Sequence, residues 1–135
     1  MIENGGNPKA RPRAPDLQIY RPTLTMTMSI AHRMTGAALY MGTLLFVWWL
    51  MAISGGSSSY ALQQRFMNSI PGRAILLFFT WSILHHALGG VRHLIWDLGL
   101  AHDDPWREYL ARATIFGSVA GTILLWVAAS LIKEI

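Results

Sequence analysis

Three long apolar runs without charged residues dominate the hydrophobic pattern, at residues 34–53, 74–91 and 113–132. Each is about 18 to 20 residues long, close to the roughly 20 residues that a helix needs to cross about 30 Å of hydrocarbon. The helices of a soluble bundle would show a polar face, and these runs have none. The pattern therefore predicts an all-α integral membrane protein with three transmembrane helices.

Polar segments between the runs define the expected domain boundaries. Residues 1–28 form a polar, basic N-terminal segment, and residues 29–133 form a three-helix membrane anchor domain. We expect the spans at about residues 29–53, 70–97 and 112–133. A Gly/Ser cluster at 54–59 separates the first two spans, because such residues break helices. A polar stretch containing Asp103, Asp104 and Pro105 separates the last two.

Basic residues gather on one side of the membrane if the three helices alternate in direction. Eight of the 11 fall on the side of the N-terminus and second loop, namely Lys9, Arg11, Arg13, Arg21, Arg33, Arg92, Arg107 and Arg112. The other three are Arg65, Arg73 and Lys133. The positive-inside rule then predicts a cytoplasmic N-terminus. Because no clear transit peptide precedes the first span, a bacterial inner membrane is favoured over the mitochondrial one.

Composition excludes several classes of function. The chain has 135 residues, too few for a flavin domain, an iron–sulfur domain and a membrane part together. It has no cysteine, so it cannot ligate iron–sulfur clusters or attach haem through thioethers. The net charge of +4 does not indicate nucleic-acid binding, because the arginines flank apolar runs instead of covering a polar face.

The second span carries ionisable residues, which are costly in a membrane and by default suggest a functional site. At about 100° per residue, His86, Gly90, His93 and Asp97 share one stripe of the helix, while His85 points roughly 100° away. A neutral imidazole at the mid-span depth of His86 suits an axial ligand of haem iron. The competing interpretation is a histidine that is hydrogen-bonded to another helix.

The first span begins with a second polar group at the same end. Its members, which share one helix face, are Ser29, His32, Arg33 and Gly36. Together with Arg92 and His93 they form two cationic clusters that we expect to attract an anion, and haem propionates fit this requirement. The alternative is ordinary anchoring to lipid phosphates.

A haem with two histidine ligands needs a second imidazole at the depth of His86. We expect His32, His93 and His102 to lie at or beyond the membrane edge, so that none of them is opposite His86. The second ligand is therefore expected from another chain.

Three segments resemble the motifs of a known family. They are RPRAPDLQIY at 11–20, SIAHRMTG at 29–36 and HALGGVRHLIWD at 86–97. In order and spacing the chain, from residue 11 to about 132, resembles the cytochrome b (large membrane anchor) subunit of succinate dehydrogenase, the succinate:quinone oxidoreductase of respiratory complex II. The first motif departs from the family pattern, with Ala14 in place of Ser and Asp16 in place of His.

The resemblance implies roles for individual residues. It places the axial ligand of haem b on His86, with His85 as the alternative because the doublet permits a one-residue slip. It places quinone binding on Ser29, Ile30 and Arg33. Contacts to the haem propionates fall on His32, Arg33, Arg92 and His93.

The resemblance also implies partners. A second small membrane anchor would supply the other haem histidine, and an iron–sulfur subunit and a flavoprotein subunit would carry the dehydrogenase chemistry. This chain would contribute no catalytic residue of that chemistry, would use quinone as substrate and would sit in membrane lipid. Two alternatives are the anchor of a quinol:fumarate reductase and a haem-free structural or assembly protein.

Overall fold

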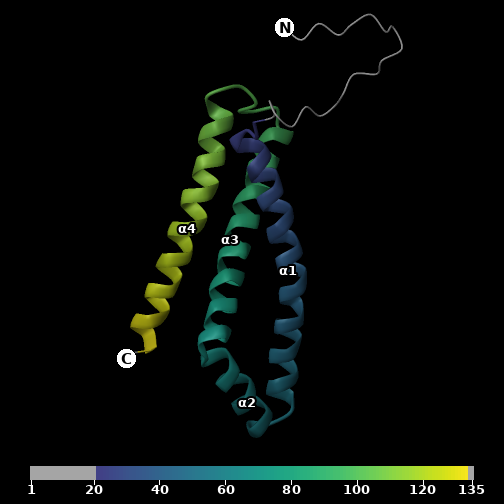
Figure 1. Ribbon diagram of the computed structural model, residues 1–135, viewed down its shortest axis with the longest axis vertical. Coiled ribbons are helices and arrows are strands. Elements are labelled where there is room, and N and C mark those ends of the chain that lie inside the picture. Colours follow the sequence, from purple (N-terminus) through teal and green to yellow (C-terminus); the bar gives the residue numbers. More distant parts are fainter. Residues whose placement is uncertain (1–20, 134–135) are drawn as a thin grey trace, which may run out of the picture.

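Three long helices and one short helix make up the fold in the computed structural model, which describes residues 21–133, without the side chain of Lys133. The long helices are α1 (Leu24–Ser54), α3 (Ile70–Asp97) and α4 (Trp106–Lys133), and the short one is α2 (Ser57–Asn68). Figure 1 shows the long helices running along one another, with α2 at the end where α1 turns back into α3. Helix α3 packs against both α1 and α4.

The three long helices are apolar enough to cross a membrane. Within Leu24–Ser54, Ile70–Asp97 and Trp106–Ile132, windows of 18 residues have mean hydropathies of 1.7, 1.6 and 2.1. Large apolar side chains such as Leu44 and Phe116 are 64% and 71% exposed, as expected of a surface that faces lipid or another subunit. The predicted all-α architecture with three membrane-spanning helices is confirmed.

Capping residues determine where the helices begin. The Oγ1 of Thr23 accepts a hydrogen bond from the backbone N–H of Met26 at 3.4 Å, so α1 starts at Leu24, ahead of the span expected near residue 29. Ser69 separates α2 from α3, and its Oγ accepts from the N–H of Gly72 at 3.3 Å. Residues 1–20 of the predicted N-terminal segment lie outside the described residues.

Helix α2 is not predicted by the hydrophobic pattern. The Gly/Ser cluster at 54–59 does break the chain, since Gly56 has a φ of +89°, but a new helix starts at Ser57. Gln63 and Met67 are buried, one turn apart on a single face of this helix. A short amphipathic helix of this kind falls below the length of the apolar runs that identify membrane spans.

Small and hydroxyl-bearing residues form the contact surfaces between the long helices. Thr35, Ser82 and Ser118 are fully buried, at 1%, 0% and 0% exposure. The spacing of Gly117 and Gly121 predicts a packing face on α4, and these glycines do face Leu88 and Leu84 of α3. Small residues let helix backbones approach closely in a membrane, where apolar burial supplies little driving force between helices.

We predict that Gly42→Ala destabilises the packing of α1 against α3. A Cβ at residue 42 would collide with the Phe79 ring, and overpacking of this kind costs about 1–3 kcal/mol. Gly117→Ala is the matched control, because its Cβ would only press on the mobile Cδ1 of Leu88 at 3.1 Å. The midpoint of thermal unfolding should fall for Gly42→Ala and change little for Gly117→Ala. Equal midpoints for the two variants would contradict the close contact between Gly42 and the Phe79 ring.

Candidate functional site

A pair of stacked histidine rings joins α1 to α3. The rings of His32 and His86 have centroids 4.0 Å apart and an angle of 4° between their planes. Two glycines make room for them: a Cβ at Gly36 would lie 3.0 Å from Cε1 of His86, and a Cβ at Gly89 would collide with the ring of His32. Glycine on each helix therefore allows an imidazole from the other helix to pack against its backbone.

The hydrogen bonds of His86 determine which of its ring nitrogens carries the proton. Its Nδ1 lies 3.1 Å from the backbone oxygen of His32 and 3.4 Å from Oγ1 of Thr35. A carbonyl oxygen can only accept, so Nδ1 must donate, and in the neutral imidazole Nε2 then keeps its lone pair. Metal-binding histidines usually donate their second ring N–H to such an acceptor, which fixes the tautomer and the ring orientation.

His85 faces the other neighbouring helix. Its ring is 2% exposed, and Nδ1 lies 3.2 Å from Oγ of Ser118 on α4. The Trp81 ring packs against it with centroids 5.0 Å apart. The predicted divergence of the two adjacent histidines is therefore present: His86 faces α1 and His85 faces α4.

The expectation that His32 lies away from His86 is wrong. We expected it near the membrane edge, away from His86, but the two rings are in contact. Helix α1 begins at Leu24, so residue 32 already lies two turns inside it. The contact is face to face, however, and a ring-nitrogen lone pair lies in the ring plane. Parallel stacked imidazoles do not direct their lone pairs at one metal between them.

Arg92 is a buried cation with unused hydrogen-bond donors. Its side chain is 2% exposed, and Nε and Nη1 have no hydrogen-bond partner among the described residues. Its guanidinium carbon lies 5.1 Å from the centroid of the Trp96 ring, a distance suited to a cation–π contact. The exposed His93 lies close by, with its ring centroid 5.2 Å from that of His32.

A cleft of about 370 Å³ opens beside these residues at the end where α1 begins and α3 finishes. Among the residues that line it are Thr25, Ser29, Arg92, His93, Trp96, His102 and Arg107. The cleft thus brings Ser29, from the polar group expected on the first span, together with Arg92 and His93 of the second span.

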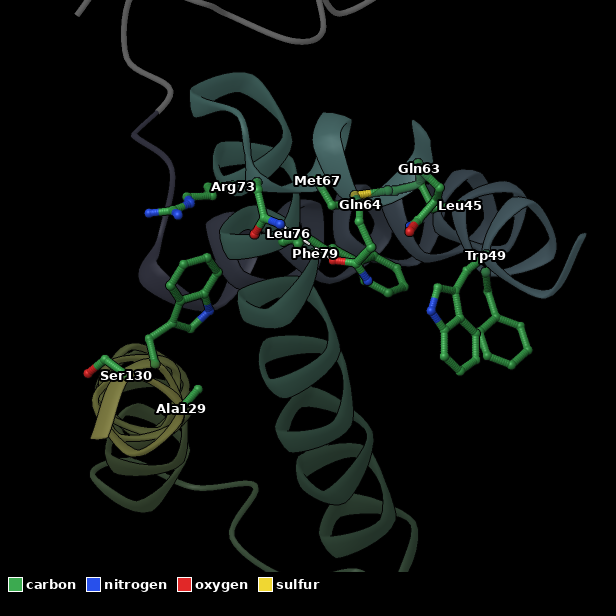
Figure 2. A pocket seen from close by; sticks show the side chains of 13 residues that line it. Leu45, Trp49, Gln63, Gln64, Met67, Arg73, Leu76, Phe79, Ala129 and Ser130 are labelled. Atoms are coloured by element: carbon green, nitrogen blue, oxygen red, sulfur yellow. Dashed lines mark hydrogen bonds between the residues drawn. The ribbon is translucent and has the colours of Figure 1, made fainter. Parts of the chain in front are cut away.

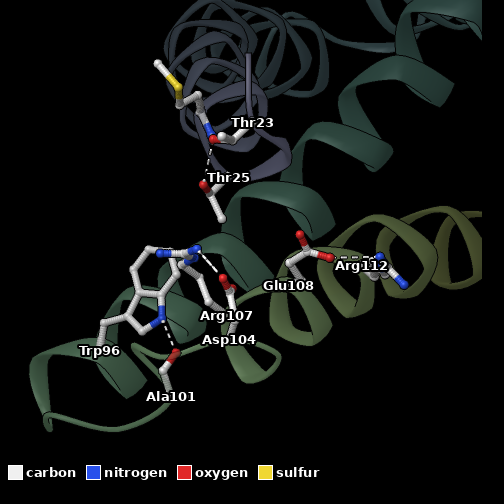
Figure 3. A network of polar contacts seen from close by, with 9 residues as sticks. Thr23, Thr25, Trp96, Ala101, Asp104, Arg107, Glu108 and Arg112 are labelled. Atoms are coloured by element: carbon white, nitrogen blue, oxygen red, sulfur yellow. Dashed lines mark hydrogen bonds and ion pairs between the residues drawn. The ribbon is translucent and has the colours of Figure 1, made fainter. Parts of the chain in front are cut away.

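The cleft wall that comes from the α3–α4 loop is fixed by polar contacts, some of which Figure 3 shows. Trp96 donates its indole N–H to the Ala101 oxygen at 3.3 Å, and Arg107 forms a double contact of 2.9 Å with the carboxylate of Asp104. His102 lies 2.9 Å from the Trp96 backbone oxygen. The sequence motifs did not identify Trp96, His102 or Arg107 as cleft residues; the only signal was their position in or beside the polar segment that joins α3 to α4.

Ile30 and Arg33 lie on the outer surface of the chain. Ile30 is 53% exposed, and Arg33 is exposed and forms no ion pair with the described residues. Arg33 follows His32 in a helix, so the two side chains point about 100° apart. Whereas His32 turns inward, Arg33 remains available to another molecule.

The described residues contain no cluster of three or more His, Cys, Asp or Glu side chains that could hold a bare metal ion. The donor set at His86 is instead a single imidazole with a free Nε2, flanked by cations. A single imidazole fits a metal ion whose other ligands come from a macrocycle. The nearby basic side chains would neutralise anionic groups on that macrocycle.

Comparison with known proteins agrees with these features. Residues 7–129 match the family described as succinate dehydrogenase/fumarate reductase transmembrane subunit. The succinate dehydrogenase cytochrome b556 subunit of Rickettsia bellii is 38% identical over 87% of this chain and 91% of its own length. That of Paracoccus denitrificans is 36% identical over 90% and 91%. The mitochondrial cytochrome b560 subunit of Mus musculus is 35% identical over 75% and 62%.

The match covers most of the chain, including α1, α3, α4 as far as residue 129, and both histidines of the stacked pair. It agrees with the resemblance carried by the sequence motifs. The chain is a multi-pass membrane protein that belongs to the succinate dehydrogenase/fumarate reductase transmembrane subunit family.

Proposed function

We propose that this chain, as the cytochrome b membrane anchor of a succinate dehydrogenase, binds haem b through Nε2 of His86 and forms part of the site at which quinone is reduced. The observation that carries the proposal is the bond between Nδ1 of His86 and the His32 carbonyl, which leaves Nε2 with its lone pair. When bound, the haem supplies a one-electron carrier beside the quinone.

His86 is a better ligand than His85 on geometric grounds. His85 is 2% exposed between α3 and α4, with Ser118 on one ring nitrogen and Trp81 against its face. A macrocycle could reach it only if the two helices separated. His86 is only half-buried, and nothing lies within 4 Å of where a Cβ of Gly90 would be, one turn along the same stripe.

Four basic side chains at one end of the bundle would hold the haem propionates. They are His32, Arg33, Arg92 and His93. Arg92 is the strongest candidate, since two of its buried donor nitrogens have no partner among the described residues, and an unpaired buried charge is costly. A carboxylate would provide charge-assisted hydrogen bonds to these donors.

The second axial histidine would come from a small membrane anchor subunit. His32 is the one imidazole in contact with His86 in the described part of the chain, and its parallel stacking does not suit shared ligation. The haem would then lie between two chains, held by His86 of this chain and by a histidine of the small membrane anchor subunit.

Ser29, Ile30 and Arg33 would bind quinone at the same end of α1. The Ser29 hydroxyl faces the cleft, and the Arg33 guanidinium is exposed nearby on the helix. Both can donate hydrogen bonds to a quinone oxygen as charge develops on it during reduction. The exposed Ile30 offers an apolar surface for the ring.

The arrangement of the complex follows from this site. The iron–sulfur subunit, which receives electrons from the flavoprotein subunit, would dock where α1 begins, close to Ser29. By the positive-inside rule this end is cytoplasmic, and we place the chain in a bacterial inner membrane.

The haem ligand can be tested by comparing two adjacent variants. His86→Ala should lower or abolish haem b in the purified complex, while His85→Ala should largely preserve it, because the two imidazoles face different helices. Haem content is measured from the absorbance of the reduced pyridine complex. Full retention in the first variant and loss in the second would reverse the assignment.

The origin of the second ligand can be tested with His32→Ala. If a partner chain provides the second histidine, this variant should keep the low-spin spectrum of a haem with two histidine ligands, although its potential can shift when the stacked ring is lost. Electron paramagnetic resonance of the oxidised complex reports the ligand set. A change to a high-spin signal in His32→Ala would identify His32 itself as the ligand.

The quinone site can be tested with Ser29→Ala and Arg33→Ala. Loss of one donor to a developing oxyanion costs about 2.7–4 kcal/mol of barrier in comparable sites, so quinone reduction should fall by roughly 10²–10³-fold. Succinate oxidation with a soluble artificial acceptor should be unaffected, because the flavin lies on another chain.

Thr27→Ala is the matched control for these variants. Its Oγ1 donates to the Thr23 carbonyl at 3.3 Å, and the residue does not line the cleft. Unchanged quinone turnover in both Ser29→Ala and Arg33→Ala, with normal haem content, would place quinone elsewhere.

A further inference from the structure

A second cleft lies at the opposite end of the helices, where α2 joins α1 to α3. Its volume is about 640 Å³, within the range typical of small-molecule sites. Figure 2 shows Leu76 and Phe79 of α3 in the cleft, with Ala129 and Ser130 of α4 on one side and side chains of α2 above. None of the sequence motifs includes the residues of this cleft.

The lining of this cleft changes from cationic to apolar with depth. Arg73 is in the first turn of α3, and Leu76 and Phe79 follow at intervals of three residues, about 4.5 and 9 Å further into the membrane. On α4, Trp126 donates its indole N–H to Oγ1 of Thr80 at 3.4 Å, so it lies level with the apolar part. This order, with a cation at the membrane surface and apolar walls below, matches the order of head group and acyl chain in a phospholipid.

Arg73 has no counter-ion within the described part of the protein. It forms no ion pair there, and no Asp or Glu occurs anywhere from residue 17 to residue 96. A cation at the membrane surface without an internal partner can be neutralised by a lipid phosphate.

Gln63 adds a second, independent feature. It is 3% exposed, lines the cleft, and its Oε1 has no hydrogen-bond partner among residues 21–133. A buried carboxamide oxygen without a donor is costly, and a hydroxyl or ammonium group from a ligand would satisfy it. Phospholipid head groups carry such donors next to the phosphate.

We propose that this cleft binds one phospholipid from the membrane leaflet on the α2 side. The phosphate contacts Arg73, a donor of the head group reaches Oε1 of Gln63, and one acyl chain runs along Leu76, Phe79 and Trp126. The site is independent of the haem and quinone sites, because it lies at the other end of the bundle.

Two pairs of matched variants test the proposal in the assembled complex. Arg73→Gln removes the phosphate contact, and Arg65→Gln removes the same charge from the same end of the molecule without touching the cleft. Ala129→Phe fills the apolar part, and Ala128→Phe adds the same bulk to a neighbouring residue outside it. Haem content in each sample verifies that the complex has assembled.

Native mass spectrometry counts the phospholipids retained by each complex, and titration of delipidated complex with phosphatidylglycerol or phosphatidylethanolamine measures their rebinding. Arg73→Gln and Ala129→Phe should each lose about one phospholipid per complex, and Arg73→Gln should weaken rebinding by roughly tenfold or more. Both controls should bind as the wild type does. Equal losses in Arg73→Gln and Arg65→Gln, or extraction of a quinone instead of a phospholipid from this cleft, would overturn the proposal.

Discussion

The hydrogen bond from Nδ1 of His86 to the backbone oxygen of His32 determines the arrangement of the candidate site. It connects α1 to α3 and selects the tautomer of a neutral imidazole in which Nε2 keeps its lone pair. The carbonyl is accessible because residue 36, one turn further along α1, is a glycine whose Cβ would press on the imidazole. Thr35, at 1% exposure, adds a second polar contact to the same nitrogen.

This use of glycine couples stability to function at the site. Small residues at helix contacts allow close approach in a membrane, and the same closeness brings a side chain of one helix to the backbone of the next. At Gly36 and Gly89 the approaching side chains are the two stacked imidazoles. The packing that holds α1 against α3 therefore also orients the proposed haem ligand, so mutations at these glycines should not be treated as purely structural.

The membrane architecture could be predicted from the sequence, because long uncharged runs have few interpretations in a chain of this length. The divergence of His85 and His86 could also be predicted, since rotation per residue in a helix is fixed. The contact between His32 and His86 could not be predicted, because it depends on how α1 packs against α3, and hydrophobicity alone does not determine that packing. Helix α2 was missed for a related reason: its amphipathic pattern is short and depends on contacts with α1 and α3.

The membrane-facing surface also explains why this fold needs partners. Small or polar residues occur at every contact between the long helices, and many large apolar side chains remain outside, including Leu44 and Phe116. Lipid acyl chains can cover most of that surface, but they offer no acceptor for the two nitrogens of Arg92 that lack a partner among the described residues. In the proposed function, one haem would satisfy both groups, with its iron at Nε2 of His86 and a propionate at Arg92. The three-helix bundle would then bind one face of that haem, and a second membrane anchor subunit would bind the opposite face.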